Sequence, residues 1–120
     1  MDLEIKSFDK ADQTRPFQGN GWADLVSIGG RDVVMGHFEP GWRWSSNVKP
    51  IAQTDLCEFP HLGYMLKGRV RVTMKDGSEL EMAAGDVVSI PPGHDAEVVG
   101  DEEAIMVDFG GQMGDYALPK

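Results

Sequence analysis

Apolar and polar residues alternate with a period of two along much of the chain, a pattern typical of strands with one buried face. The alternation is clearest over residues 69–75 and resumes over residues 79–82. Between them, Asp76-Gly77 is a dipeptide that favours a two-residue hairpin turn. We therefore predict an antiparallel hairpin with Val70, Val72, Leu80 and Met82 on one shared buried or pocket-facing surface and with Arg71 and Lys75 pointing outward.

Glycine-rich turns divide the rest of the chain into further short strands, predicted at residues 22–28, 32–38, 56–66, 87–90, 96–99 and 104–109. Residues 87–90 are mostly apolar, so we expect a buried strand there. Residues 42–54 show neither the strand period nor the helix period and predict an ordered loop. We predict no helix with convincing caps in the chain. Many short strands of this spacing indicate an all-β, antiparallel sandwich or barrel.

The length of 120 residues predicts a single domain over residues 1–120. Within it we expect a polar N-terminal arm with a short opening strand at residues 1–20 and a C-terminal tail at residues 110–120.

The composition narrows the classes of partner. Twenty acidic residues against 11 basic ones give a net charge of −9, which repels phosphate groups, so we expect neither nucleic acid nor membrane as a partner. The single cysteine, Cys57, excludes an intrachain disulfide and fits a reducing compartment. The first residues lack the basic and apolar regions of a signal peptide, so we expect a cytoplasmic protein.

Polar chemistry is concentrated at one corner of the predicted sheet, in residues 85–99. Pro91-Pro92-Gly93 ends the apolar strand before it, because proline cannot donate to a strand ladder and glycine adopts a positive φ. His94, Asp95 and Glu97 follow immediately. This corner is therefore the first candidate for a functional site.

Gly85, Pro91 and Gly93 have the spacing of a motif, Gly-x5-Pro-x-Gly-x2-His, that is found in the cupin superfamily. Over residues 30–109 the chain resembles cupins, and the resemblance implies a jelly-roll barrel, the double-stranded β-helix. The motif's histidine position is Ala96 in this chain. The segments Pro-Gly-Trp-Arg-Trp and Pro-Pro-Gly-His-Asp-Ala, with a cysteine four residues before a histidine, resemble a subgroup of small stand-alone bacterial cupins.

The other cupin motif supplies further metal ligands, and counting back from Gly68 places its ligand positions at Asp55, Cys57 and His61. These three share one face if their strand is unbroken, and His94 shares it if the following strand begins early. The resemblance implies a mononuclear site inside the barrel, and we expect a divalent metal (Zn, Fe, Mn or Ni) held by His61, Cys57, His94 and Asp55.

Simpler roles for the same residues remain open. Cys57 is equally a small buried hydrophobe, His61 a core histidine bonded to a backbone carbonyl or to Tyr64, and His94 a turn residue in solvent. Glu58 has the opposite parity and is expected on the surface. A thiolate–imidazolium pair of Cys57 and His61 is disfavoured, because four residues of extended strand separate them by about 13 Å.

For the ligand itself, we expect contacts from residues near the mouth and lumen of the barrel, namely Trp42, Arg43, Trp44, Tyr64 and Met65. Tryptophan rings stack on planar groups and Arg43 suits a carboxylate, although either tryptophan also fits a role in capping the core. His37 is expected to be structural. Five methionines are expected to fill the core, namely Met35, Met65, Met74, Met82 and Met106.

Two functions remain open at this stage. One is a small-molecule-binding cupin barrel acting as a metal-dependent enzyme, with catalytic residues and substrate unidentified. The other is a non-catalytic ligand-binding or sensory module that has lost the usual metal site. In both cases we expect a homodimer in which the N-terminal arm or first strand extends the partner's sheet, because jelly rolls leave sheet edges that need covering.

Overall fold

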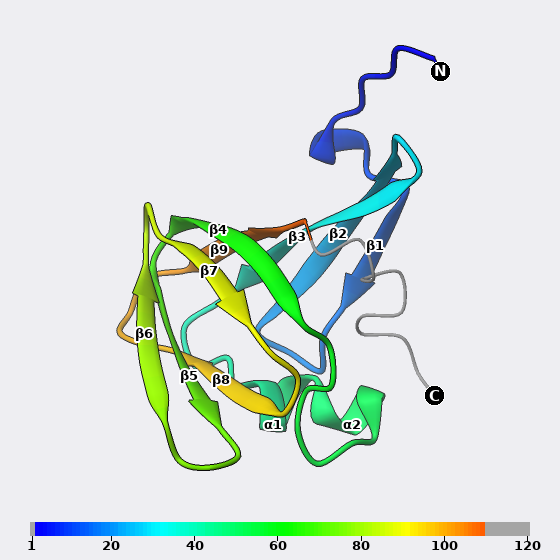
Figure 1. Cartoon of the computed structure of the whole chain (residues 1–120). Coiled ribbons are helices and arrows are strands. Elements are labelled where there is room, and N and C mark those ends of the chain that lie inside the picture. The colour runs from blue at the N-terminus through cyan, green and yellow to red at the C-terminus, as the bar shows by residue number, and fades with distance from the viewer. Residues whose placement is uncertain (1, 110–120) are drawn as a thin grey trace.

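The computed structural model describes residues 2–109 and forms two antiparallel sheets that face each other (Figure 1). The six-stranded sheet has the order β1-β2-β3-β9-β4-β7 and the three-stranded sheet the order β6-β5-β8. The strands are β1 Gln13–Pro16, β2 Gly21–Ile28, β3 Arg31–Phe38, β4 His61–Lys67, β5 Arg69–Met74, β6 Glu79–Ala83, β7 Val87–Ile90, β8 His94–Val98 and β9 Ala104–Asp108. The predicted all-β antiparallel class is confirmed. The predicted tail at 110–120 lies outside the described residues.

Both sequence-local hairpins form as predicted. In β5 and β6, Val70 pairs with Met82 and Val72 with Leu80 across the turn at Asp76-Gly77, where Gly77 has a φ of 88°. Likewise β2 and β3 pair in register through the turn at Gly29-Gly30. The opening strand expected in the N-terminal arm is β1, and a short 3-10 turn, η1 Phe8–Lys10, precedes it.

Residues 42–54 are not a helix-free loop, because two one-turn helices form there, α1 Trp44–Asn47 and α2 Lys49–Ala52. They are held by hydrogen bonds of one side chain: that of Asn47 accepts from the Arg43 backbone N–H and donates to the carbonyl of Gln18, in a distant segment. Such short helices complete less than two turns, so they leave no periodic pattern in the sequence. Figure 1 shows both helices at one end of the barrel.

Two strand predictions need correction at their starts. The strand expected at 56–66 begins only at His61, directly after Pro60, and the segment before it contributes a single bridge from Cys57 to His94. By contrast, β8 begins at His94, two residues before the predicted start, because His94 pairs with Met74.

The burial prediction was wrong at Val87. Val87 is 74% exposed, because β7 lies at the edge of its sheet and alternates between inside and outside instead of being buried throughout. Leu80 is 47% exposed because β6 is the edge strand of the smaller sheet, but it lines a surface pocket together with its cross-strand partner Val72, so it lies on the pocket-facing surface predicted for it.

The core lies between the two sheets. Its largest fully buried side chains are Met65, Val48, Val70, Val72 and Cys57. Of the five methionines expected there, Met65, Met82 and Met106 are buried, and Met35 and Met74 are half-buried. Among residues 2–109, no helix is long and apolar enough to span a membrane.

Candidate functional site

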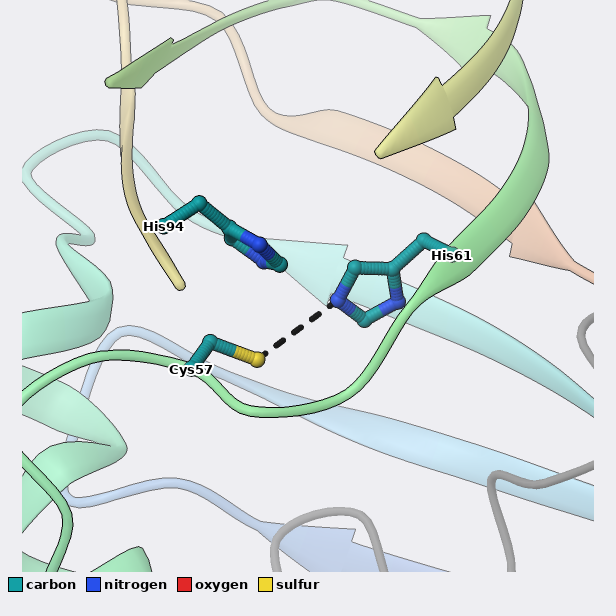
Figure 2. Close-up of side chains that lie close together, drawn as sticks. All are labelled: Cys57, His61 and His94. Carbon is teal, nitrogen blue, oxygen red and sulfur yellow. Dashed lines mark hydrogen bonds between the residues drawn. The ribbon is translucent and has the colours of Figure 1, made fainter. Parts of the chain in front are cut away.

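Cys57, His61 and His94 meet inside the barrel, and all three are buried. One nitrogen or sulfur from each side chain lies within 4.8 Å of the corresponding atoms of the other two. Figure 2 shows the three side chains pointing toward one another from three separate segments: the coil before β4, the start of β4 and the start of β8.

The backbone fixes Cys57 beside His94. The Cys57 N–H donates to the His94 carbonyl over 2.8 Å, and the Gly93 N–H donates to the Cys57 carbonyl over 2.7 Å. Gly93 takes a φ of 91° at this corner, a conformation that favours glycine. The Pro91 carbonyl accepts a hydrogen bond from Nδ1 of His94 over 2.8 Å. Since a carbonyl only accepts, Nδ1 carries a proton, and Nε2 is the nitrogen that remains available to a ligand.

His61 is held from the opposite side by Asp108 of β9. Nδ1 of His61 lies 2.5 Å from Oδ2 of Asp108, and Nε2 lies 3.6 Å from Sγ of Cys57. Asp108 is 2% exposed and forms part of β9 beside β4, so the carboxylate reaches His61 within one sheet. A carboxylate behind a histidine fixes the ring and makes the outer nitrogen a better ligand or base.

The pKa values of Cys57 and His61 are shifted in opposite directions. Burial acts to raise the pKa of the Cys57 thiol, but hydrogen bonds and charge from His61 and His94 outweigh burial and lower it from 9.0 to about 6. Burial acts to lower the pKa of His61, but the hydrogen bonds and charges of Asp108 and Cys57 raise it from 6.5 to about 9. Between these values the metal-free pair is a thiolate beside an imidazolium.

The expectation that Cys57 and His61 are held about 13 Å apart was wrong. It assumed an extended strand, whereas the chain between them is not part of a strand. Cys57 and His61 therefore come within contact distance.

Asp55, the fourth expected ligand, is not brought to this cluster. Its side chain is fully exposed and its nearest charged neighbour is Lys49, at 3.7 Å. The chain leaves α2 through Gln53 in the left-handed conformation, with a φ of 60°, so the parity expected of one continuous strand does not apply to Asp55. Glu58 is exposed, as predicted.

An apolar cavity of about 40 Å³ adjoins His61 and His94. Trp42 and Trp44 line it and are 3% and 2% exposed, so both also belong to the core. Both indole nitrogens are buried and have no hydrogen-bond partner among residues 2–109.

The other three expected ligand contacts are not in the cavity. Arg43 points outward and forms an ion pair with Glu97. Tyr64 is 39% exposed, on the opposite face of β4 from His61, and Met65 is fully buried but does not line the cavity. Successive side chains of an extended chain point to opposite sides, so adjacent residues such as Tyr64 and Met65 have different surroundings.

His37 has the structural role predicted for it, away from the cavity. Its ring stacks on Trp22 at 4.4 Å and lies within 3.4 Å of Asp24 and 3.3 Å of Glu103.

Asp108 is the residue that the sequence reasoning missed, although a signal for it exists. Ala104, Met106 and Asp108 share one parity in the last predicted strand, and all three are buried. A carboxylate on the inward face of an apolar strand needs a partner, so it points to a polar site inside the barrel.

Comparison with known proteins identifies the class. A family model of the cupin domain matches residues 58–110. Residues 58–110 thus match a cupin domain, and the predicted resemblance to the cupin superfamily is confirmed. No curated protein matches the sequence.

Several solved structures share the fold at low sequence identity. An uncharacterized conserved protein with a double-stranded β-helix domain from Klebsiella pneumoniae is 22% identical over 94% of this chain and 95% of its own, with a TM-score of 0.58. A protein of unknown function from Rhizobium leguminosarum is 18% identical over 90% of this chain and 95% of its own, with a TM-score of 0.63. A sugar phosphate isomerase of the cupin superfamily from Silicibacter pomeroyi is 16% identical over 88% of this chain and 73% of its own, with a TM-score of 0.63.

Proposed function

We propose that the protein is a small-molecule-binding cupin with a divalent metal held by Cys57, His61 and His94. The observation that carries the proposal is the convergence of these three ligand atoms within 4.8 Å, at the edge of an apolar cavity. Tetrahedral bonds of about 2.0–2.3 Å place ligand atoms about 3.3–3.8 Å apart, so the separation of 3.6 Å between Sγ of Cys57 and Nε2 of His61 fits such a centre.

The donor types favour zinc among the metals considered. One thiolate and two imidazoles suit zinc, iron or nickel, whereas manganese prefers carboxylate and carbonyl oxygens. Three protein ligands leave a coordination position for a small molecule, as in catalytic zinc sites. A metal there would supply a Lewis acid that polarises an oxygen atom of the ligand.

The protein's own residues prepare the site for such a metal. Asp108 holds the proton on Nδ1 of His61, and the Pro91 carbonyl does the same for His94, so both histidines present Nε2. The apolar wall keeps bulk water away and strengthens electrostatic interactions inside the cavity.

Without a metal, the same geometry supports a second function. Cys57, His61 and Asp108 then form a thiolate, an imidazolium and a supporting carboxylate, the arrangement of an activated nucleophile. A non-catalytic ligand-binding or sensory cupin is the alternative if neither metal binding nor thiol reactivity is found. We propose the cytoplasm as the location, in keeping with the free thiol.

The test of the metal centre is metal-dependent stabilisation of protein purified without an affinity tag. At a free metal concentration a hundred times the dissociation constant, binding to the folded state alone adds about 2.7 kcal/mol to the free energy of unfolding. We expect thermal unfolding to shift upward by several degrees. Elemental analysis of the same preparation should find the metal that the cell supplies.

Two variants make this test specific. His61→Ala removes one ligand and should abolish most of the metal-dependent shift, whereas Glu58→Ala removes an exposed carboxylate near the site and should leave the shift intact. Because a metal displaces the proton of His61, whose pKa is about 9, the shift should grow as the pH rises toward 9. The shift should shrink more steeply below about pH 6, where Cys57 also binds a proton. If zinc, iron, manganese and nickel all leave the unfolding temperature unchanged, the metal centre is wrong.

A further inference from the structure

The barrel wall is open between β6 and β7. Strand β6 is an edge of the three-stranded sheet and β7 an edge of the six-stranded sheet, so no strand pairing joins them. A short turn at residues 84–86 connects the two strands, and Figure 1 shows them separating with distance from this turn. A surface pocket of about 270 Å³, which we call the β6–β7 groove, lies between their far ends.

Apolar side chains form most of the wall of this groove, namely Val72, Met74, Leu80, Ile90 and Pro91. Leu80 lies on the inner face of its sheet, since it pairs with the buried Val72, yet it is 47% exposed. Met74 shares this inner face and is half-buried. Apolar surface that lines a hollow and stays in contact with water favours the binding of an apolar molecule.

The groove adjoins the candidate metal site. Val72 and Ile90 line both the groove and the cavity beside His94, so they form the partition between the two spaces. Met74 pairs with His94 across the strands, and the Pro91 carbonyl accepts the hydrogen bond from Nδ1 of His94. A molecule in the groove is therefore separated from the metal ligands only by the partition.

The polar groups around the groove favour an uncharged molecule. Glu79 is the one charged side chain among the described residues that line it, and the other polar side chains there are the hydroxyls of Ser78 and Ser89. The chain has a net charge of −9, which repels an anion at the mouth of the groove. Further in, the apolar wall of the cavity disfavours burial of an ion of either sign.

We propose that the β6–β7 groove is the entrance to the cavity and binds the chain of an uncharged, unbranched aliphatic molecule with a terminal oxygen. The oxygen end passes between Val72 and Ile90, and the rest of the chain covers Met74 and Leu80. The cavity, at about 40 Å³, is far below the range of about 300–1,000 Å³ that is usual for ligand sites, whereas the groove is close to that range. The position of the oxygen rests on the proposed metal centre, but the position of the chain does not.

The test follows the methionine methyl groups, labelled with ¹³C, by nuclear magnetic resonance during a titration with 1-hexanol. The titration is done with and without zinc, and substitution of each methionine by leucine assigns its signal. We expect 1-hexanol to shift the signals of Met74, in the groove, and of Met82 and Met106, in the cavity. Met35 is the internal control and should not shift, because it lies on the opposite face of β3 from the cavity-lining Val34.

Chain length measures the apolar contact. Burial of one further methylene group should tighten binding about fourfold, so the affinity should rise in steps from 1-butanol to 1-hexanol. Zinc should strengthen the binding of each alcohol, because the hydroxyl oxygen then has the metal as a partner.

A pair of leucine variants locates the chain. Covering the exposed half of Leu80 contributes about half of what full burial of a leucine does, so Leu80→Ser should weaken binding of 1-hexanol about three- to tenfold. Leu62→Ser is the matched control and should leave the affinity unchanged, because Leu62 is 52% exposed but lies on the outer face of β4. If Leu80→Ser fails to fold, the methyl signals of the wild-type protein still decide the question.

Several outcomes would overturn the proposal. An unchanged Met74 signal would reject the groove as a binding site. A shift of Met74 without a shift of Met82 and Met106 would reject the passage between Val72 and Ile90. Hexanoate or hexylammonium binding as tightly as 1-hexanol would contradict an uncharged occupant. A Met74 signal that changes when the protein alone is diluted would show that a second copy of the chain occupies the groove instead.

The metal centre is tested separately from the groove. Failure of the protein to bind zinc, or any of the other metals tested, rejects the proposed function, and the Met74 signal of the metal-free protein then decides the groove alone. Zinc binding with no response of Met74 to 1-hexanol rejects the groove and leaves the metal centre intact.

Discussion

At the scale of single residues, the pairing of Cys57 with His61 determines how the site responds to protons. The raised pKa of His61, from 6.5 to about 9, stabilises the folded state below pH 6.5, and this contribution is lost as the pH rises through 9. The lowered pKa of Cys57, from 9.0 to about 6, stabilises it above pH 9, and this contribution is lost as the pH falls through 6. The two dependences have opposite signs and cover nearly the same range.

This cancellation gives a prediction for the metal-free protein. Between pH 6.5 and 9 the folded pair holds one proton, on His61, and the unfolded chain also holds one, on Cys57. We therefore expect the pair to add almost no pH dependence to the free energy of unfolding in this range. In Cys57→Ser, Asp108 still raises the pKa of His61, but the opposite contribution of Cys57 is gone. The free energy of unfolding should therefore fall as the pH rises, by at most about 1.4 kcal/mol per pH unit.

Urea unfolding of both proteins at several pH values, with a chelator present, measures this difference. For each protein, the slope of the free energy of unfolding against pH is determined. The informative quantity is the slope for Cys57→Ser minus the slope for the wild-type protein, because the two proteins share all other titrating groups. A variant that becomes more stable relative to the wild-type protein as the pH rises would show that Cys57 and His61 do not share a proton.

The sequence predicted the site only in part, for reasons visible in these residues. Cys57, His61 and His94 were all named as ligands, since motif spacing and residue type point to them, and the structure brings them together. Asp55 was misplaced because strand parity was extended across residues that are not a strand. Asp108 is far from the others in sequence, and only the pairing of β4 with β9 places it beside His61.

At the scale of elements, positive-φ glycines set the turns that place the strands, and they differ in how tightly they are packed. Gly68 joins β4 to β5 with a φ of 74°, and a Cβ there would lie 2.5 Å from the Glu103 carbonyl oxygen. Gly77, in the turn between β5 and β6, has a φ of 88° and open space around it. Both positions disfavour other residues, but only Gly68 also requires close approach of another backbone segment.

Substitution by alanine should therefore lower the free energy of unfolding by different amounts at the two glycines. Gly77→Ala should lower the free energy of unfolding by about 1–2 kcal/mol, the cost of the left-handed conformation. Gly68→Ala carries the same cost and in addition forces the backbone at Glu103 and Ala104 to move, so it should be more destabilising by at least about 2 kcal/mol. Denaturant unfolding at fixed pH measures both. Equal effects would show that the chain at Gly68 relaxes freely.

Elements with local signals were predictable and those decided by tertiary contacts were not. The hairpins at Gly29-Gly30 and Asp76-Gly77 follow from their turn dipeptides and alternating residues. The helices α1 and α2 depend instead on hydrogen bonds to a distant segment, such as that from Asn47 to the Gln18 carbonyl. Edge positions explain the exposure of Val87 and Leu80, which no local pattern indicates.

At the scale of the whole molecule, the part of the N-terminal arm that precedes η1 is exposed along its length. Leu3 and Ile5 are 103% and 94% exposed, and Figure 1 shows the arm projecting away from both sheets. The neighbouring strand β1 forms an edge of the six-stranded sheet, so one side of its backbone has no strand beside it among the described residues. Apolar side chains next to an open edge favour association with a second chain.

We predict a homodimer in which this arm packs on the partner. Light scattering at micromolar concentration should give twice the chain mass of 13.2 kDa. Because Leu3 and Ile5 are almost fully exposed in their own chain, the double variant Leu3→Ser and Ile5→Ser should weaken the dimer without lowering the stability of the monomer. The double variant Glu4→Ser and Lys6→Ser is the control, since it alters the arm but keeps its apolar residues.

A wild-type mass near that of one chain would contradict the dimer. A dimer unaffected by the loss of Leu3 and Ile5 would instead show that another surface forms the interface, for which the exposed side chains of Leu62, Leu66 and Val87 are the next candidates.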